Sequence, residues 1–276
     1  QMMRCQPALG TYVEIQAYAD ASDAAATEAW LSLAIDQAFA AIATVQSCMS
    51  VFDPQSDVSR LNAGTFIHAQ GPIHPWLWAL LSLAQEIHQH SPAFDPCAGH
   101  ALAQNGLRPN VGTARGSLAD VCLLPNHHVL TTQALYLDLG GIAKGEAVDR
   151  AVQALQAHGV ESGCVNAGGD LRAFGQRAQP IFVRHPDSPQ HAVHVGDLQD
   201  GALATSGDYF ATQRNDIPGH LIDPSCNAPI ATPRSFSVMA PRCAVADALT
   251  KVYAITGDAH HPAMRHFGAQ ALEVFV

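Results

Sequence analysis

The chain has 276 residues, of which 48% are hydrophobic and only 14% are charged. This composition fits a well-buried globular core and excludes wholesale disorder. The formal net charge of −10 argues against nucleic-acid binding, so a phosphate-bearing ligand would need local donors or a cation. Length alone does not decide between one domain and two, and we expect no apolar run long enough to cross a membrane.

Seven cysteines are scattered along the chain in an odd number, with no Cys-x-x-Cys pair. This spacing predicts neither a disulfide framework nor a zinc site, so we expect mostly buried free thiols. The chain begins at Gln1 instead of an initiator methionine. A signal peptide or lipid anchor could therefore precede the given sequence.

Two elements are predicted near the N-terminus. Residues 10–18 alternate between apolar and polar side chains, which indicates a half-buried strand. A long helix capped by Asp23 should then run to about Ser47. Its apolar stripe is expected to face the core and consists of Leu31, Ile35, Phe39 and Ile42.

The next segment is rich in polar residues. Ser56 to Asn62 could be ordinary turn chemistry or part of a binding loop, and the pattern does not decide between them. A second helix should begin at Pro75, a favoured first helical position, and end near His90. His88 and His90 lie two residues apart, so they face different sides and are predicted to be surface residues.

The middle of the chain is predicted to consist mostly of loops. Residues 93–99 form a tight acidic turn, and residues 105–126 are loop-rich. Adjacent histidines rarely chelate one metal ion, so His127 and His128 are not predicted to be ligands.

The most informative stretch runs from Leu137 to Gly145. An apolar strand is expected to end at Gly140-Gly141, and after Lys144-Gly145 a helix should run to His158. The free N–H groups and dipole of such a helix suit an anion such as phosphate. Residues 164–170 form a second strand that ends in two glycines, which indicates that both turns contribute backbone to one cleft.

The last third contains another candidate site. Ser206, His220 and Asp223 invite a hydrolase-triad interpretation, but no nucleophile-elbow context surrounds Ser206, so we do not favour it. A strand at 235–239, a helix at 245–257 and a strand at 271–276 are predicted to follow. This irregular alternation favours an α+β fold in one continuous unit, residues 1–276.

Taken together, these segments resemble the ApbE family of FAD:protein FMN transferases, in the family's motif order and over most of the chain. The matching segments are Leu9 to Thr11, Met49-Ser50, Ser56-Asp57, Leu61-Asn62, Ala93 to Asp95, Asp138 to Gly145, Asn166 to Asp170, Thr205 to Asp208, His220 to Pro224 and Ala246 to Leu249.

The resemblance implies a T-fold-like α+β unit of mixed sheets and packed helices around a flavin cleft. It implies that the protein binds FAD, breaks its pyrophosphate and moves FMN onto a Thr or Ser hydroxyl of a partner flavoprotein, releasing AMP. The alternatives are an FAD-binding protein without transferase activity and an FAD pyrophosphatase. A periplasmic or inner-membrane location is implied, with membrane contact only through an N-terminal anchor; the cytoplasm is the alternative.

The resemblance also implies site residues. Flavin contacts would come from Met49, Ala93, Phe94, Asp95, Gly140, Glu146 and the main chain of Leu221. The carbonyl of Ala143 and the carboxylate of Asp247 would bind Mg²⁺, a hard cation that prefers oxygen ligands. His220 would be the catalytic base, because a histidine starts with a pKa near neutrality.

The sequence departs from the family at three places. Four residues after Asp247, where the family has an oxygen ligand, stands Lys251, which can reach Asp247 across one helical turn. Lys251 could turn outward while Thr250 or water completes a metal site, could replace the metal as counter-charge, or could be a surface lysine. The turn at 225–229 and Cys97 also lack hydroxyl groups that the family has, which puts transfer more than FAD binding in doubt.

Overall fold

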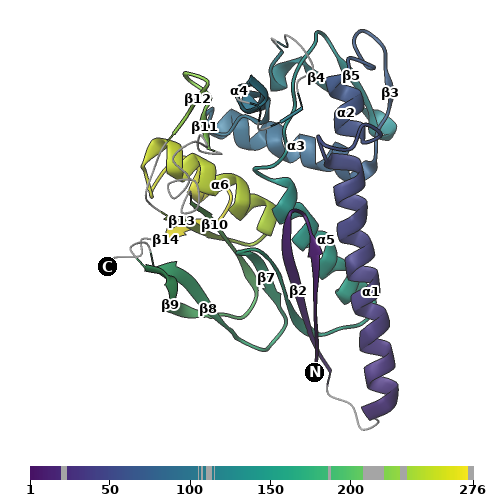
Figure 1. The fold of residues 1–276 in the computed structure, drawn as a ribbon, viewed down its shortest axis with the longest axis vertical. Coiled ribbons are helices and arrows are strands. Elements are labelled where there is room, and N and C mark those ends of the chain that lie inside the picture. Colours follow the sequence, from purple (N-terminus) through teal and green to yellow (C-terminus); the bar gives the residue numbers. More distant parts are fainter. Residues whose placement is uncertain are drawn as a thin grey trace.

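A seven-stranded antiparallel sheet organises the fold (Figure 1). The computed structural model describes residues 1–19, 24–104, 106, 108–109, 114, 116–185, 188–207, 221–230 and 235–272. In spatial order, the sheet consists of β1 (Met2–Ala8), β2 (Thr11–Tyr18), β6 (Ser162–Ala167), β7 (Asp170–Phe174), β10 (Gly201–Gly207), β13 (Ser235–Ala240) and β14 (Gln270–Leu272).

Three helices pack with this sheet to form the main core. They are α1 (Ala24–Met49), α5 (Ala143–Ala157) and α6 (Cys243–Thr256). The helix α5 contacts β6 and β7, α6 contacts β10 and β13, and α1 lies along α5 (Figure 1). The sheet side of this core includes Val13, Ile15 and Ala17, which are all fully buried, as the alternation in the sequence predicts.

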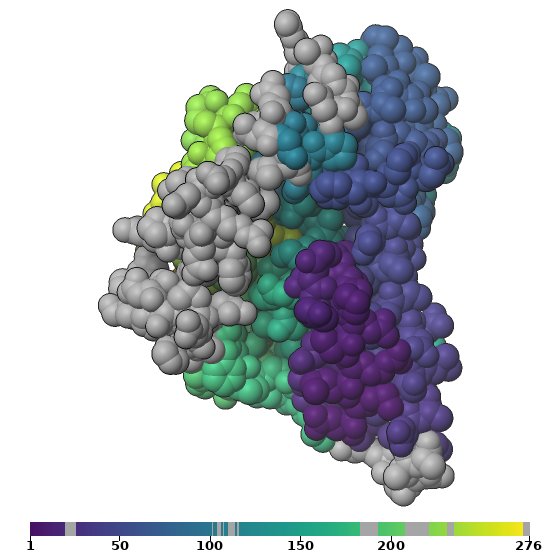
Figure 2. All heavy atoms as spheres, viewed as in Figure 1, coloured from purple at the N-terminus to yellow at the C-terminus, as the bar shows by residue number. Residues whose placement is uncertain are grey.

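Helix α1 differs from one expectation. Its segment Ala26–Met49 is long and apolar enough to meet the criteria of length and composition for a membrane span, although no apolar run of that length was expected. The predicted stripe explains this apolarity, because Leu31, Ile35 and Ile42 are buried in the core and Phe39 packs at its margin. Figure 2 shows the β1–β2 pair alongside this helix, where the Arg4 guanidinium is 2.6 Å from the Asp36 carboxylate.

A second group of elements covers one end of the core (Figure 1). It contains α2 (Asp57–Asn62), α3 (Pro75–His90), α4 (His100–Gln104) and a small sheet of β3 (Gly71–Pro72), β5 (His128–Thr131) and β4 (Val121–Leu124). Short 3-10 helices span Pro96–Gly99, Leu118–Asp120 and Pro125–His127. The remaining elements are the hairpins β8 (Gln179–His185)–β9 (Ser188–Leu198) and β11 (Ile222–Asp223)–β12 (Ala228–Pro229), and α7 (Pro262–His266).

The predicted α+β class is confirmed, and α3 has the predicted bounds. The strand β1 and the helix α7 were not predicted. The predicted cap Asp23 and residues 273–276 of the last predicted strand lie outside the described residues. All seven cysteines are free, but only Cys48, Cys97 and Cys243 are buried, so the expectation of mostly buried thiols was too broad.

Asp149 of α5 fixes the position of α6. Its buried carboxylate accepts hydrogen bonds from the N–H groups of Cys243 (3.0 Å) and Ala244 (3.1 Å), the first two residues of α6. The same carboxylate accepts a bond of 2.7 Å from the Arg172 guanidinium on β7. Close packing supports this arrangement, because a Cβ at Gly145 would collide with the backbone at Cys243. A side chain from one helix therefore caps the other, where the N-terminal N–H groups favour an anion.

We expect Asp149→Ala to lower the free energy of unfolding by about 3–5 kcal/mol, because it leaves the partly buried Arg172 guanidinium and two buried helix N–H groups without their acceptor. Urea unfolding followed by circular dichroism measures this change. The control is Asp36→Ala, which removes a half-exposed carboxylate from a surface ion pair and should cost at most about 1 kcal/mol. Equal losses in both variants would contradict the capping role.

Candidate functional site

Two adjoining hollows, which share four lining residues, form the candidate site. The first hollow has a volume of about 370 Å³ and lies between the 93–99 turn, the end of β10 and α6. The second hollow has a volume of about 400 Å³ and lies against the end of α1. Arg108, Asp138, Gly140 and Lys144 line both hollows, and we call these four residues the neck.

The backbone that leads into the neck, residues 134–139, is held by hydrogen bonds from other segments and not by pairing with a strand. The predicted strand before Gly140 was wrong, because residues 134–139 pair with no strand. Instead, the Asn62 amide donates to the Leu137 carbonyl at 2.9 Å and accepts from the Leu137 N–H at 2.7 Å. The Asp138 N–H donates to the Pro96 carbonyl at 2.9 Å. The polar segment around Asn62 therefore acts through structure, by fixing the neck from 75 residues away.

Asp138 organises the turn itself. One of its carboxylate oxygens accepts from the Gly140 N–H at 2.8 Å, and the other accepts from the Arg108 guanidinium at 2.7 Å. Gly99 allows this close packing, because a Cβ there would collide with the Asp138 side chain. The acidic turn is fixed in a similar way, since the Asp95 carboxylate accepts from the Cys97 N–H at 2.8 Å and caps the 3-10 helix Pro96–Gly99.

We expect Asn62→Ala to lower the free energy of unfolding by about 2–4 kcal/mol, because both backbone groups of Leu137 would be buried without partners. Thermal or urea unfolding measures this change, and titration with a flavin measures the loss of affinity that a distorted cleft would cause. Gln89→Ala on the exposed side of α3 is the control and should be nearly neutral. Unchanged stability in the Asn62 variant would show that the neck is fixed by other contacts.

Two lysines and two buried carboxylates form one cluster beside the neck. The Lys144 ammonium pairs with Asp170, and the Lys251 ammonium pairs with Asp247. The carboxylates are 1% and 0% exposed, whereas the lysine side chains are 30% and 18% exposed. Both lysines line the first hollow. The positive charges therefore lie toward the cleft, with their counter-charges behind them.

The pKa values of the cluster follow from burial and from these charges. Burial alone would lower the pKa of Lys144, but the carboxylates of Asp247 and Asp170 outweigh it and hold the pKa above its usual value. Burial, reinforced by the charge of Asp247, raises the pKa of Asp170 to about 6. Burial would also raise the pKa of Asp247, but Lys251 and Lys144 outweigh it and hold that pKa below its usual value.

Most of the predicted flavin contacts lie along the cleft. Ala93, Phe94, Asp95 and Leu221 line the first hollow, Met49 lines the second, and Gly140 lines both. Of the two predicted metal ligands, Ala143 lines the second hollow. Asp247 lies behind Lys251 and lines neither hollow. It is linked to the helix that begins at Ala143 by the hydrogen bond that its carboxylate accepts from the Gly145 N–H.

Glu146 is not brought to the cleft. It is 1% exposed and lines neither hollow, and its two oxygens are 2.7 Å from the Arg150 guanidinium and 3.0 Å from that of Arg242. Burial raises its pKa against the lowering effect of both arginines. In this structure, Glu146 links α5 to the start of α6 instead of reaching a ligand.

Other predicted features lie apart from the cleft or outside the described residues. His220, the predicted base, belongs to the segment 208–220, which the structure does not describe. Gly168 and Gly169 line neither hollow, so the second glycine turn reaches the cleft only through the pair of Asp170 with Lys144. The Ser206 hydroxyl is 2.7 Å from that of Thr250, and Asp223 accepts from the Ser225 N–H at 2.8 Å.

Arg108 and Lys144 are cleft residues to which the sequence assigned no individual role. Arg108 lies in the loop-rich segment, where no periodicity or spacing indicates a role. Lys144 stands within the Lys-Gly pair in the first turn of α5, and the spacing of that pair from the glycine turn is the signal that could have assigned it. The guanidinium of Arg108 also lies 5.5 Å from the ring centre of Phe52, which lines the second hollow.

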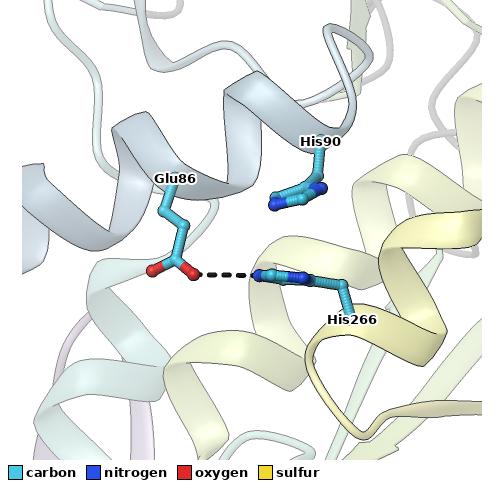
Figure 3. Close-up of side chains that lie close together, drawn as sticks. All are labelled: Glu86, His90 and His266. Carbon is cyan, nitrogen blue, oxygen red and sulfur yellow. Dashed lines mark hydrogen bonds and ion pairs between the residues drawn. The ribbon is translucent and has the colours of Figure 1, made fainter.

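A surface cluster of Glu86, His90 and His266 also brings candidate metal ligands together (Figure 3). The His266 Nε2 is 3.0 Å from the Glu86 carboxylate, and the His90 and His266 rings stack with centres 3.6 Å apart. A histidine binds metal in the plane of its ring, and stacked rings direct their nitrogens into parallel planes. We therefore interpret this exposed cluster, which lines neither hollow, as a contact between α3 and α7.

The fold and the cleft define an α+β protein with a divided, cation-lined ligand site. Comparison with known proteins identifies its family: the chain belongs to the ApbE family, whose model matches residues 9–275. In fold it is similar to the ApbE protein from Thermotoga maritima, with 26% identity and a TM-score of 0.74 over 97% of this chain and 91% of that chain.

Two sequence relatives carry the name FAD:protein FMN transferase. The relative from Treponema pallidum (strain Nichols) is 35% identical over 168 residues, which cover 54% of this chain and 46% of that protein. The relative from Vibrio cholerae serotype O1 is 34% identical over 132 residues, which cover 45% of this chain and 40% of that protein. The chain thus spans about half the length, or less, of these relatives.

Proposed function

We propose that this protein is an FAD:protein FMN transferase. The observation that carries the proposal is the division of the cleft into two hollows that share the neck. FAD has the matching form, because it consists of two ring systems joined by a charged pyrophosphate. Lys144 and Arg108 supply positive charge at the neck, and the main chain at Gly140 allows a phosphate to approach closely. The names of the two relatives support the same activity.

The proposed reaction moves FMN to a hydroxyl group of a Thr or Ser in an acceptor flavoprotein. The hydroxyl oxygen attacks the phosphorus on the FMN side of the pyrophosphate, a new P–O bond forms, and the P–O–P bridge breaks. AMP leaves with the bridging oxygen and its electron pair, and the hydroxyl proton passes to His220. Catalysis of this kind consists mainly of positioning the phosphate and neutralising its charge.

The resemblance also implies Mg²⁺ at Ala143 and Asp247, but the donor set here does not fit that ion. Asp247 uses one carboxylate oxygen for the Lys251 ammonium and the other for the Gly145 N–H, at 3.1 Å. An ammonium cannot be a metal ligand, and a cation at this carboxylate would meet repulsion of about 4 kcal/mol from a charge 4 Å away in a surface-like dielectric. The proposed reaction therefore contains no step that depends on a metal ion.

The location and the acceptor belong to the same proposal. We place the reaction in the periplasm or at the inner membrane, because the resemblance implies that location for this protein. The second candidate function is FAD binding without chemistry, which the lost hydroxyls at Cys97 and in the turn at 225–229 favour.

We expect incubation with FAD and a flavoprotein acceptor that contains the target Thr or Ser to give covalent FMN on the acceptor and one AMP per FMN. Mass spectrometry of the acceptor and chromatography of the nucleotides measure the two products. His220→Ala should lower the rate by about 10²–10⁴-fold, because proton transfer by a positioned base contributes that much. FAD binding should stay nearly unchanged in this variant.

The control is His128→Ala, since His128 lies on β5 and lines neither hollow. AMP without covalent FMN would favour an FAD pyrophosphatase, and binding without either product would favour the binder. Full turnover by His220→Ala would overturn the assignment of the base.

A further inference from the structure

Lys251 lies at the cleft because of what surrounds it on both sides. It stands one turn after Asp247 on α6, and its ammonium bonds both the Asp247 carbonyl oxygen, at 2.9 Å, and the carboxylate. Its stem lies over the glycine turn, where the Lys251 Cε is 3.3 Å from the position that a Cβ at Gly141 would occupy. The predicted reach of Lys251 to Asp247 is thereby confirmed, and an outward surface position is excluded.

Thr250 is not available as the oxygen ligand that Lys251 replaces. It is fully buried and lines neither hollow. Its hydroxyl donates to the Asp247 carbonyl at 2.6 Å and is 2.7 Å from the Ser206 hydroxyl. The hydroxyl is therefore engaged within the protein, which leaves counter-charge as the remaining account of Lys251.

The ammonium of Lys251 still has capacity for a ligand. A lysine ammonium has three donors, and the described contacts of Lys251 use two of them, both for Asp247. The side chain lines the first hollow beside Lys144 and Gly140. The third donor can therefore reach an anion in the cleft, while Asp247 holds the ammonium in place from behind.

The composition of the chain points to the same two residues. Of its fourteen basic residues, twelve are arginines and only two are lysines, Lys144 and Lys251. Both lysines line the first hollow. A compact ammonium at the end of a flexible stem suits the contact with a phosphate as a point charge.

We propose that Lys251, together with Lys144, is the counter-charge for the pyrophosphate of FAD, so that FAD binding in this protein needs no divalent cation. The inference rests on the proposed function only in taking FAD as the ligand, and it holds whether or not transfer follows. Lys251 supplies through its ammonium what an ion at Asp247 would supply, and it excludes that ion by occupying the carboxylate.

The first test is the metal dependence of FAD binding, measured by flavin fluorescence in EDTA and in magnesium chloride. The wild-type Kd should differ by less than about twofold between the two buffers, because a fixed ammonium replaces the ion. Lys251→Thr should raise the Kd in EDTA by about tenfold or more, and magnesium should restore it. Lys251→Arg should keep most of the binding in EDTA, and Lys251→Met should lose it in both buffers.

The second test uses the wild-type protein, so it does not depend on how a variant folds. Acylation of the two lysines by an amine-reactive ester is followed by peptide mass spectrometry, with and without FAD, in EDTA. FAD should slow the acylation of both Lys251 and Lys144. Slower acylation of Lys144 alone would overturn the inference, as would wild-type FAD binding that magnesium strengthens about tenfold while Lys251→Thr leaves that dependence unchanged.

The two proposals fail separately. If FAD protects Lys251 from acylation and binds without magnesium, but no acceptor gains FMN, the proposed transferase activity is wrong and the role of Lys251 stands. If covalent FMN forms but FAD binding to the wild type requires magnesium, the activity stands and the role of Lys251 is wrong.

Discussion

The arrangement of the cleft depends on the buried carboxylate of Asp149. It joins three elements at once, because it accepts from the first two N–H groups of α6 and from Arg172 on β7 while it belongs to α5. The cost of burying this charge is offset by hydrogen bonds from groups that would otherwise lack acceptors. With α5 and α6 fixed in this way, Lys144 at the start of one helix and Lys251 on the other face the same hollow.

A second constraint acts on the other wall of the cleft. Asn62 replaces a neighbouring strand by bonding both backbone groups of Leu137, and Asp138 then shapes the turn through Gly140 and Arg108. A side-chain amide can do this because it carries a donor and an acceptor side by side. The two glycines of this turn, Gly140 and Gly141, line the first hollow. The polar segment after α1 therefore has a structural role, which is to support the binding site.

The positive and negative side chains beside the cleft lie at different depths. Asp170 and Asp247 lie behind the two lysines, so the acidic chain as a whole, with a net charge of −10, can still present positive charge to an anionic ligand. The nearest charges decide which ligand the cleft attracts, because interactions over a few ångströms in a partly buried site outweigh those of distant, screened charges. The position of Lys251 also separates this protein from the metal site that its family resemblance implies, and the difference lies in one residue of α6.

The sequence by itself determined the elements and the family. Alternation at 10–18, the apolar stripe of α1 and the start of α3 at Pro75 all appear as predicted, because burial of one face imposes a period on the chain. The order of motifs indicated the ApbE family, and the spacing of Lys251 from Asp247 predicted their pairing. Tertiary structure alone decided the Asn62 clamp, the Arg108 contact and the capping of α6 by Asp149. These contacts join residues that lie 75, 30 and 94 positions apart, and no local period records such partners. The same reason explains Glu146, whose motif indicated a ligand contact but whose partners in the fold are two arginines.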